Sequence, residues 1–100
     1  MDAAALALSA RHDANPPAAL TAEQRVLWLA LAGRWHGAHD ACQDLPDPAG
    51  AWIHAWLHRE EGDLENAAYW YSRARQPVPA RDLSLDEEWR QIAEALSPSA

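Results

Sequence analysis

Two glycines 29 residues apart divide the middle of this chain into two similar units. In each unit an apolar segment leads to the glycine, Gly33 or Gly62, and a second segment leads from it to a proline, Pro48 or Pro77. Glycine permits the left-handed backbone that ends a helix, and proline cannot continue one. Each unit therefore predicts two helices joined by a tight turn. Other pairs that align under the same shift are Trp35 with Leu64, Ala38 with Ala67, Cys42 with Tyr71, and Leu45 with Ala74.

Apolar residues recur along the chain at intervals of three and four, as they do on one side of an α-helix. No segment shows the sustained alternation that is typical of a β-strand. Two pairs with the spacing of a capping box, Thr21 with Gln24 and Ser84 with Glu87, mark helix starts. Together with the Gly and Pro breaks, this pattern predicts helices within residues 2–13, 21–32, 34–44, 49–61, 63–75 and 84–96.

The composition favours an all-α fold. The chain has 23 Ala and 12 Leu but only two Val and two Ile, so it has little material for strands. Six Trp supply most of the large side chains, since there is no Phe. Trp packed against Ala is a large-into-small arrangement, in which Ala lets helix backbones approach each other. The sequence is compatible with a core that holds all six Trp and with one that leaves some of them exposed.

The second unit has Ala55 in the first helix, Gly62 and Asp63 at the turn, and Ala67, Tyr71 and Ala74 in the second helix. With these residues it resembles a tetratricopeptide (TPR) repeat. The stretch GDLENAAYWYSRA is also similar to small bacterial proteins of unassigned function. The resemblance covers residues 21–79 and implies antiparallel helical hairpins that stack as a short array. It also implies a protein-binding role, because repeat arrays of this class present concave binding surfaces.

We expect the whole chain to form one domain, over residues 1–100. Two repeats leave apolar faces uncovered at both ends, because a repeat array needs about three units or caps to bury a continuous core. The segments outside the repeats are therefore predicted to cap them. The expected division is 1–20 (N-terminal helix and linker), 21–47 (first repeat), 48–79 (second repeat) and 80–100 (C-terminal capping helix).

Charge and hydropathy argue against nucleic-acid and membrane partners. The net charge is −7 and the eight Arg are scattered, so the chain lacks the basic stripe that binds phosphates. The longest apolar run is VLWLALA, residues 26–32, whereas a membrane span needs about 20 residues. Asp2 stands where a signal peptide has positive charge, and Cys42 is the single cysteine. We expect a cytoplasmic protein, and Arg without any Lys is typical of a GC-rich bacterial genome.

Three histidines are the strongest candidates for metal ligands. His54 and His58 are four residues apart, so they share one face of a helix and can chelate a metal ion. An antiparallel hairpin can bring His39 of the preceding helix beside them, which would give a three-ligand site with an open position. The alternative is that these side chains fill helix-packing positions. A zinc-protease site is not indicated, because Ala55 stands where that motif has its catalytic Glu.

We expect no enzymatic activity and no cofactor. Cys42 with His39 has the composition of a nucleophile and its base. However, Cys42 lies late in its helix, where the helix dipole disfavours a thiolate, and on the apolar side, where a free cysteine acts as a small hydrophobic residue. The acidic run around Asp63 is explained by a helix cap and solvated carboxylates. The sequence has no Gly-rich phosphate loop, nucleophile elbow or cysteine cluster.

The leading hypothesis from the sequence is a protein–protein interaction module that binds another protein or a second copy of itself. Trp, Tyr and Arg dominate interface hot spots. A self-complementary patch is the commonest route to a homodimer. A metal- or small-ligand-binding protein that uses His39, His54 and His58 is the alternative. The residues predicted to bind the partner are Trp28, Trp52, Trp56, Arg59, Trp70, Arg73 and Arg75.

Overall fold

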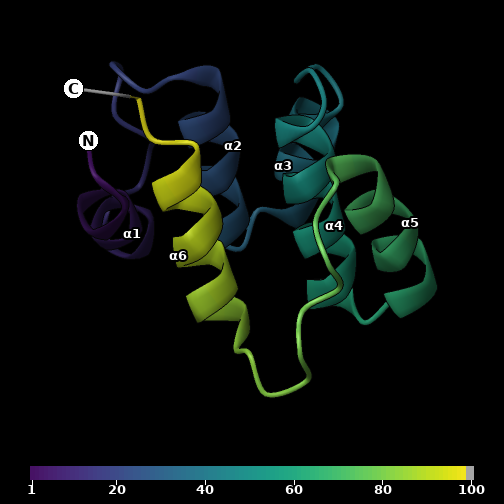
Figure 1. The fold of residues 1–100 in the computed structure, drawn as a ribbon. Coiled ribbons are helices and arrows are strands. Elements are labelled where there is room, and N and C mark those ends of the chain that lie inside the picture. The colour runs from purple at the N-terminus through teal and green to yellow at the C-terminus, as the bar shows by residue number, and fades with distance from the viewer. Residues whose placement is uncertain (99–100) are drawn as a thin grey trace.

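The computed structural model describes residues 1–98, which form six α-helices and no β-strand (Figure 1). The predicted all-α fold is confirmed, and each predicted segment contains one helix. None of the described helices has the length and apolar character that a bilayer span requires. The helices are α1 (Ala3–His12), α2 (Ala22–Leu31), α3 (Trp35–Cys42), α4 (Ala49–Glu61), α5 (Leu64–Ala74) and α6 (Leu85–Ala95).

Local side-chain chemistry sets most of the helix ends. At the start of α2 the Thr21 side chain accepts a hydrogen bond from the Gln24 N–H, and the Gln24 side chain accepts one from the Thr21 N–H. The predicted capping box is therefore complete. Between α4 and α5, Gly62 has a φ of 89°, which is left-handed backbone that favours glycine. Asp63 then caps α5 by accepting from the Asn66 N–H.

The start of α6 departs from the prediction in one detail. Ser84 accepts a hydrogen bond from the Glu87 N–H at 3.0 Å, which is the first half of a capping box. The second half is absent, because the Glu87 carboxylate accepts from the guanidinium of Arg90 instead. Arg90 lies nearly one turn further along the same face of α6, and a charged donor competes well with a backbone N–H for a carboxylate.

α4 and α5 form an antiparallel hairpin, and α3 lies beside α4 (Figure 1). α2 packs against both α3 and α4, and it joins them to α1 and α6. The long connection after α5 carries the chain back to α6, which lies against α1, α2 and α4. The two helices predicted to cap the repeats, α1 and α6, therefore also contact each other.

Four tryptophans link the helices through their indole N–H groups. Each indole donates a hydrogen bond to a group on a different helix or at its end, so every one of these side chains is both a packing unit and a cross-link. The donors and acceptors are Trp28 with Ser9 Oγ (3.0 Å), Trp35 with the Leu57 carbonyl (2.8 Å), Trp56 with the Leu85 carbonyl (3.0 Å), and Trp89 with the Leu27 carbonyl (3.0 Å).

The structure corrects the prediction that Trp28 and Trp56 belong to a binding surface. Their exposed fractions are 0% and 2%, and both lie in the main hydrophobic core. The physical reason is that α4 is buried along most of its length, so Trp56 meets the core although Trp52, one turn earlier, is only partly buried. Both indoles also donate to groups inside the fold.

The end of α3 and the start of α4 approach each other closely at Gly50. A Cβ atom at this position would lie 2.7 Å from the carbonyl oxygen of Leu45 and 3.0 Å from that of Cys42. Only glycine avoids this clash with the backbone. The close approach sets the spacing between the two helices that carry the candidate histidines.

Candidate functional site

Three histidines from two helices converge where α3 meets α4. His39 comes from α3, and His54 and His58 come from successive turns of α4. One ring nitrogen of each lies within 4.8 Å of the others. The closest pair is the Nε2 atoms of His39 and His54, which share a hydrogen bond of 2.9 Å. His54 and His58 are buried and His39 is partly buried. The convergence that the sequence could only suggest is therefore present in the fold.

Two tryptophan rings stack on two of the histidine rings. The ring of Trp35 stacks on that of His39, with centroids 4.8 Å apart and an interplanar angle of 11°. The ring of Trp70 stacks on that of His54 at 3.8 Å and 12°. These stacks restrict the imidazole orientations and exclude water from their faces. The cluster is therefore a preorganised set of side chains rather than three independent rotamers.

Two of the three histidines have a polar partner on the nitrogen that faces away from the cluster. His58 Nδ1 lies 2.6 Å from Glu61 Oε2, and His39 Nδ1 lies 3.2 Å from the side-chain amide of Gln43. The Glu61 carboxylate accepts from His58 Nδ1, which leaves a lone pair on His58 Nε2, where the amide nitrogen of Asn66 lies 3.4 Å away. At His39 the neighbouring atom is the amide nitrogen of Gln43, which is a donor, so Nδ1 of this histidine accepts. Metal-binding histidines almost always donate their outer N–H to an oxygen, and His58 has this arrangement.

The surroundings of His54 keep its imidazole neutral. Burial lowers its pKa to about 4, with further lowering from the nearby charges of His39, His58 and Arg73, while Asp47 acts in the opposite direction. A neutral imidazole has the free lone pair that a metal ion requires. His54 is therefore in its ligand form at neutral pH and in mild acid.

The donor set suits a borderline transition-metal ion. Zinc binds histidine nitrogen at 2.0–2.1 Å in tetrahedral geometry, which places ligand nitrogens about 3.3 Å from one another. The observed separations run from 2.9 Å to at most 4.8 Å, so small side-chain rotations would complete such a site. Three neutral imidazoles favour zinc, copper, nickel or iron over calcium or magnesium, which prefer oxygen ligands.

Cys42 lies close to the cluster but is not part of it. Its thiol is buried and donates to the carbonyl oxygen of His39 at 3.2 Å. Burial, together with the charge of Asp40, raises the pKa of this thiol to about 12. A thiol with so high a pKa is a poor nucleophile. The prediction that Cys42 has a packing role stands on these contacts.

The three arginines predicted to bind a partner point to different places. Arg59 donates to the buried carboxylate of Glu88 at 2.9 Å, so its charge is used inside the fold. Arg73 pairs with Asp47 at 2.7 Å on the other side of the α4–α5 hairpin. Arg75 is exposed just after α5. Arg59 and Arg73 therefore do not share a face.

The two remaining tryptophans of the predicted set are partly buried. Trp52 and Trp70 pack together against the small core cluster of Ala55, Ala67 and Tyr71. The guanidinium of Arg73 lies over the ring of Trp70, with its Cζ 4.9 Å from the ring centroid. Trp70 is thus the predicted partner residue that the fold joins to the histidine cluster.

Three residues of the site were outside the sequence prediction: Trp35, Gln43 and Glu61. Each is related to a histidine by helical spacing, since Trp35 and Gln43 lie four residues before and after His39 and Glu61 lies three after His58. Side chains at these intervals are neighbours on one helix face. This spacing is the signal that would have identified them once the histidines were selected.

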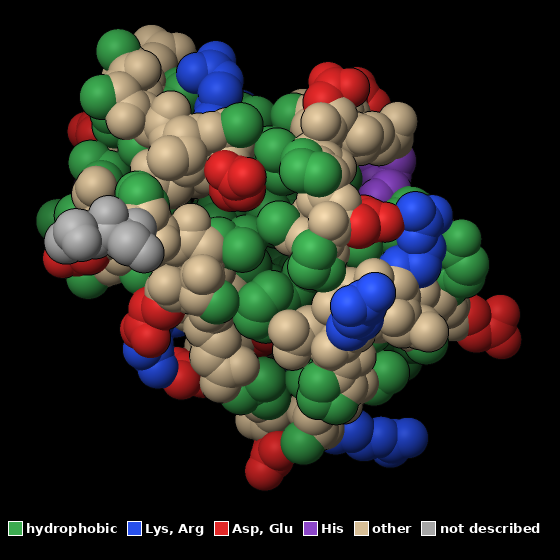
Figure 2. Space-filling view, turned by 45° about the horizontal axis from the view of Figure 1, so that its top comes forward, with side chains coloured by type: hydrophobic (Ala, Val, Ile, Leu, Met, Phe, Trp, Pro, Cys, Tyr) green, Lys and Arg blue, Asp and Glu red, His purple; other side chains and the backbone are tan. Residues whose placement is uncertain are grey.

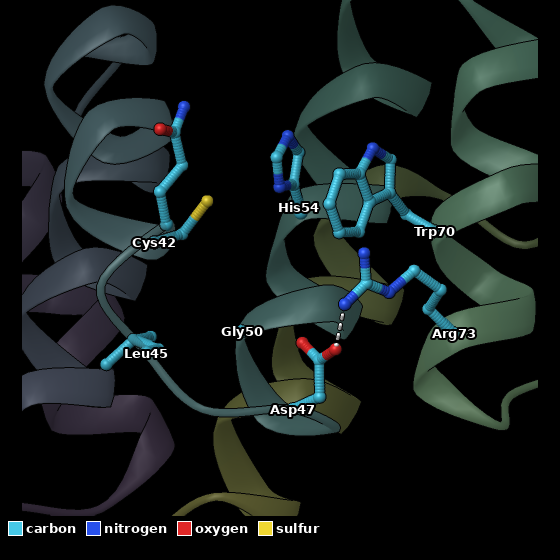
Figure 3. A pocket seen from close by; sticks show the side chains of 8 residues that line it. Cys42, Leu45, Asp47, Gly50, His54, Trp70 and Arg73 are labelled. Carbon is cyan, nitrogen blue, oxygen red and sulfur yellow. Dashed lines mark hydrogen bonds and ion pairs between the residues drawn. The ribbon is translucent and has the colours of Figure 1, made fainter.

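Two cavities lie beside α5. The first, of about 340 Å³, opens between α3 and the α4–α5 hairpin, and its walls include His54, Trp70 and Arg73 (Figure 3). The second, of about 650 Å³, follows the other side of α5, where Tyr71 and the exposed Val78 contribute to a largely apolar groove. The first cavity adjoins the histidine cluster, because His54 belongs to both.

Comparison with known protein families, with curated proteins and with solved structures finds no significant match for this chain.

We expect the metal-free protein to lose stability in acid through His54. The unfolded chain protonates this group near pH 6.5, whereas the folded chain keeps it neutral down to about pH 4. The unfolded state binds more protons in this interval, so the stabilisation is complete above pH 6.5 and is lost as the pH falls towards 4. The loss should be about 2 kcal/mol between pH 7 and pH 4.5.

Urea unfolding at these two pH values, for the wild-type chain and for His54→Gln, measures this contribution. Carboxylates titrate in both proteins, so the informative quantity is the difference between their pH dependences. The variant should show a smaller loss, by about 2 kcal/mol. An equal loss in both proteins would contradict the role given to His54.

Proposed function

We propose that this chain binds one divalent transition-metal ion, with zinc as the best match, through His39, His54 and His58. The observation that supports the proposal is the convergence of three ring nitrogens from two helices within 4.8 Å. A packing role needs one hydrogen-bond partner per imidazole and does not require three nitrogens at one point. The Glu61 carboxylate at the outer nitrogen of His58 is the kind of partner that a metal-binding histidine needs.

A metal ion would also answer an electrostatic difficulty in the cluster. Positive charge on all three imidazoles at once would be costly, because like charges at such distances repel strongly in a buried setting. Without a cation, the Nε2 atoms of His39 and His54 share one hydrogen bond of 2.9 Å, and His58 Nε2 has only a long contact of 3.4 Å with the amide nitrogen of Asn66. A cation at the centre uses all three lone pairs at once.

Zinc titration of metal-free protein tests the proposal. We expect one zinc per chain by calorimetry, and a higher melting temperature with zinc, since a ligand that binds only the folded state must stabilise it. His39→Ala, His54→Ala and His58→Ala should each lower the affinity by more than about a hundredfold, because even outer partners cost 10–100-fold. Glu61→Ala, which removes such a partner, should cost about 10–100-fold.

His36→Ala is the matched control. His36 lies on α3 next to the site, is exposed and is not a member of the converging set. Its removal should leave stoichiometry and affinity unchanged, and circular dichroism should show that each variant remains helical. A chain that takes up no zinc and melts at the same temperature with and without it would refute the proposal.

Protein binding is a second proposed function, and the groove along α5 is the observation that favours it. Leu64 and Val78 at this groove are 66% and 63% exposed, which is unusual for large apolar side chains. On the face shown in Figure 2, hydrophobic side chains also gather in a continuous area bordered by charged groups. If the chain binds no metal, this groove is the leading candidate for its binding site.

We also propose a cytoplasmic location, since a free buried Cys42 suits a reducing compartment.

A further inference from the structure

One polar side chain of α5 reaches the histidine cluster. The amide nitrogen of Asn66 lies 3.4 Å from His58 Nε2. Because Glu61 engages His58 Nδ1 at 2.6 Å, Nε2 is the nitrogen of this ring that is left to bind a metal ion. Among residues 1–98, Asn66 is the only non-histidine side chain with a hydrogen-bonding contact to an Nε2 atom of the cluster. Asn66 therefore lies where a further metal ligand would be needed.

The packing of α5 on α4 directs Asn66 towards the cluster. Trp70 lies one turn after Asn66 on α5, and its ring stacks on that of His54, with centroids 3.8 Å apart. His54 in turn lies one turn before His58 on α4. Because the two helices are antiparallel (Figure 1), Asn66 faces His58 in the same row in which Trp70 faces His54. The stack of Trp70 on His54 therefore fixes the face of α5 that carries Asn66.

The side chain of Asn66 is not used to cap α5. Asp63 begins this helix by accepting a hydrogen bond from the Asn66 backbone N–H at 3.3 Å. In a capping box, the side chain at the position of Asn66 would accept from the Asp63 N–H. That N–H already donates to the His58 carbonyl at 2.9 Å. The amide of Asn66 can therefore turn towards a metal ion without loss of the helix cap.

The contact distance matches that between two ligands of one ion. Tetrahedral zinc separates neighbouring ligand atoms by about 3.3 Å, and the Asn66 amide atom lies 3.4 Å from His58 Nε2. In the metal-free chain this atom is a nitrogen, whose N–H donates to the free lone pair of His58. A cation that takes this lone pair favours the amide oxygen instead. A half turn about the last side-chain torsion of Asn66, which is a soft one, exchanges the two atoms.

We propose that the amide oxygen of Asn66 is the fourth ligand of the metal ion bound by His39, His54 and His58. The inference rests on the proposed metal site. It closes the position that three histidines leave open, and it brings the ligands from α3, α4 and α5 to one ion. Metal sites with four protein ligands are structural, whereas catalytic sites keep one position for water or substrate. The ion would therefore hold these three helices together and not activate water.

Cobalt(II) in place of zinc tests this ligand, because the visible spectrum of cobalt changes with its ligands. Azide is the probe, since it replaces water on cobalt more readily than it replaces a protein ligand. Asn66→Ala should bind cobalt about tenfold or more weakly than the wild-type chain, and its cobalt form should bind azide about tenfold or more tightly at pH 7.5. Asn66→Asp offers a charged oxygen ligand, so it should bind cobalt about tenfold or more tightly than Asn66→Ala and should resist azide.

Ser72→Ala is the matched control, because Ser72 is a small, neutral and exposed polar residue of the same helix. It should match the wild-type chain in cobalt affinity and in azide response. Failure of the wild-type chain to bind cobalt refutes the metal site itself. A wild-type cobalt form that binds azide as tightly as Asn66→Ala has water as its fourth ligand, which overturns this inference alone. Cobalt binding by Asn66→Asp as weak as that of Asn66→Ala also overturns it.

Discussion

Trp28→Ala should destabilise the protein by about 3–5 kcal/mol, which is a large part of the 5–15 kcal/mol that a domain of this size has. The Trp28 side chain is fully buried in the main core. Its replacement leaves a cavity and removes the hydrogen bond to Ser9 that joins α2 to α1. The melting temperature should fall by about 15–25 °C, as measured by circular dichroism and by urea unfolding.

Two further variants show whether volume or hydrogen bonding dominates this effect. Trp28→Phe keeps most of the ring but removes the N–H donor, so it should cost about 1–2 kcal/mol. Leu8→Ala changes a residue of α1 that is 62% exposed and should stay within about 0.5 kcal/mol. A Trp28→Ala protein as stable as Leu8→Ala would show that the core is not organised around this side chain.

The helices could be predicted from the sequence because their ends depend on neighbouring residues. Thr21 and Gln24 form their capping box within one turn, and Gly62 supplies the left-handed residue between α4 and α5. Such signals involve side chains only three or four positions apart. The path of α6 could not be predicted in the same way. It follows a connection without regular structure and depends on where the Trp89 side chain finds its place in the core.

The roles of the tryptophans were not predictable for a related reason. Pattern analysis identifies the buried side of a helix that also has a polar side. Most of α4 between Gly50 and His58 is buried, so its periodicity does not separate Trp52 from Trp56. Which of them meets the main core depends on the helices packed around α4, and these lie far away in the sequence.

The histidine cluster was predictable in part. The spacing of His54 and His58 placed them on one face, because that relation is internal to α4. The distance from His39 depends on how closely α3 meets α4, and Gly50 sets this approach through contacts with the backbone of α3 and the following turn. A single glycine without a repeat partner gave no signal of such a contact. The structure was needed to bring the third histidine to the site.

Glu88→Ala should destabilise the protein by about 3–5 kcal/mol, because it breaks a buried polar network that connects α4, α5 and α6. The Glu88 carboxylate accepts hydrogen bonds from the Tyr71 hydroxyl at 2.6 Å and from Arg59 at 2.9 Å. Glu88 is 3% exposed and the Arg59 side chain 16%. Removal of the Glu88 carboxylate leaves the partly buried Arg59 guanidinium and the buried Tyr71 hydroxyl without this acceptor, and this loss accounts for most of the cost.

The same reasoning predicts that removal of the whole network costs much less than removal of its centre. Arg59→Met, Tyr71→Phe and Glu88→Leu combined leave no buried charge unpaired, so this triple variant should recover most of the stability lost in Glu88→Ala. Glu94→Ala, on an exposed part of α6, should change stability by less than about 1 kcal/mol, since its pairing with Arg90 is at the surface. Urea unfolding of the four proteins gives the comparison. A triple variant less stable than Glu88→Ala would mean that the network contributes net stability, rather than only orienting α6 against the α4–α5 hairpin.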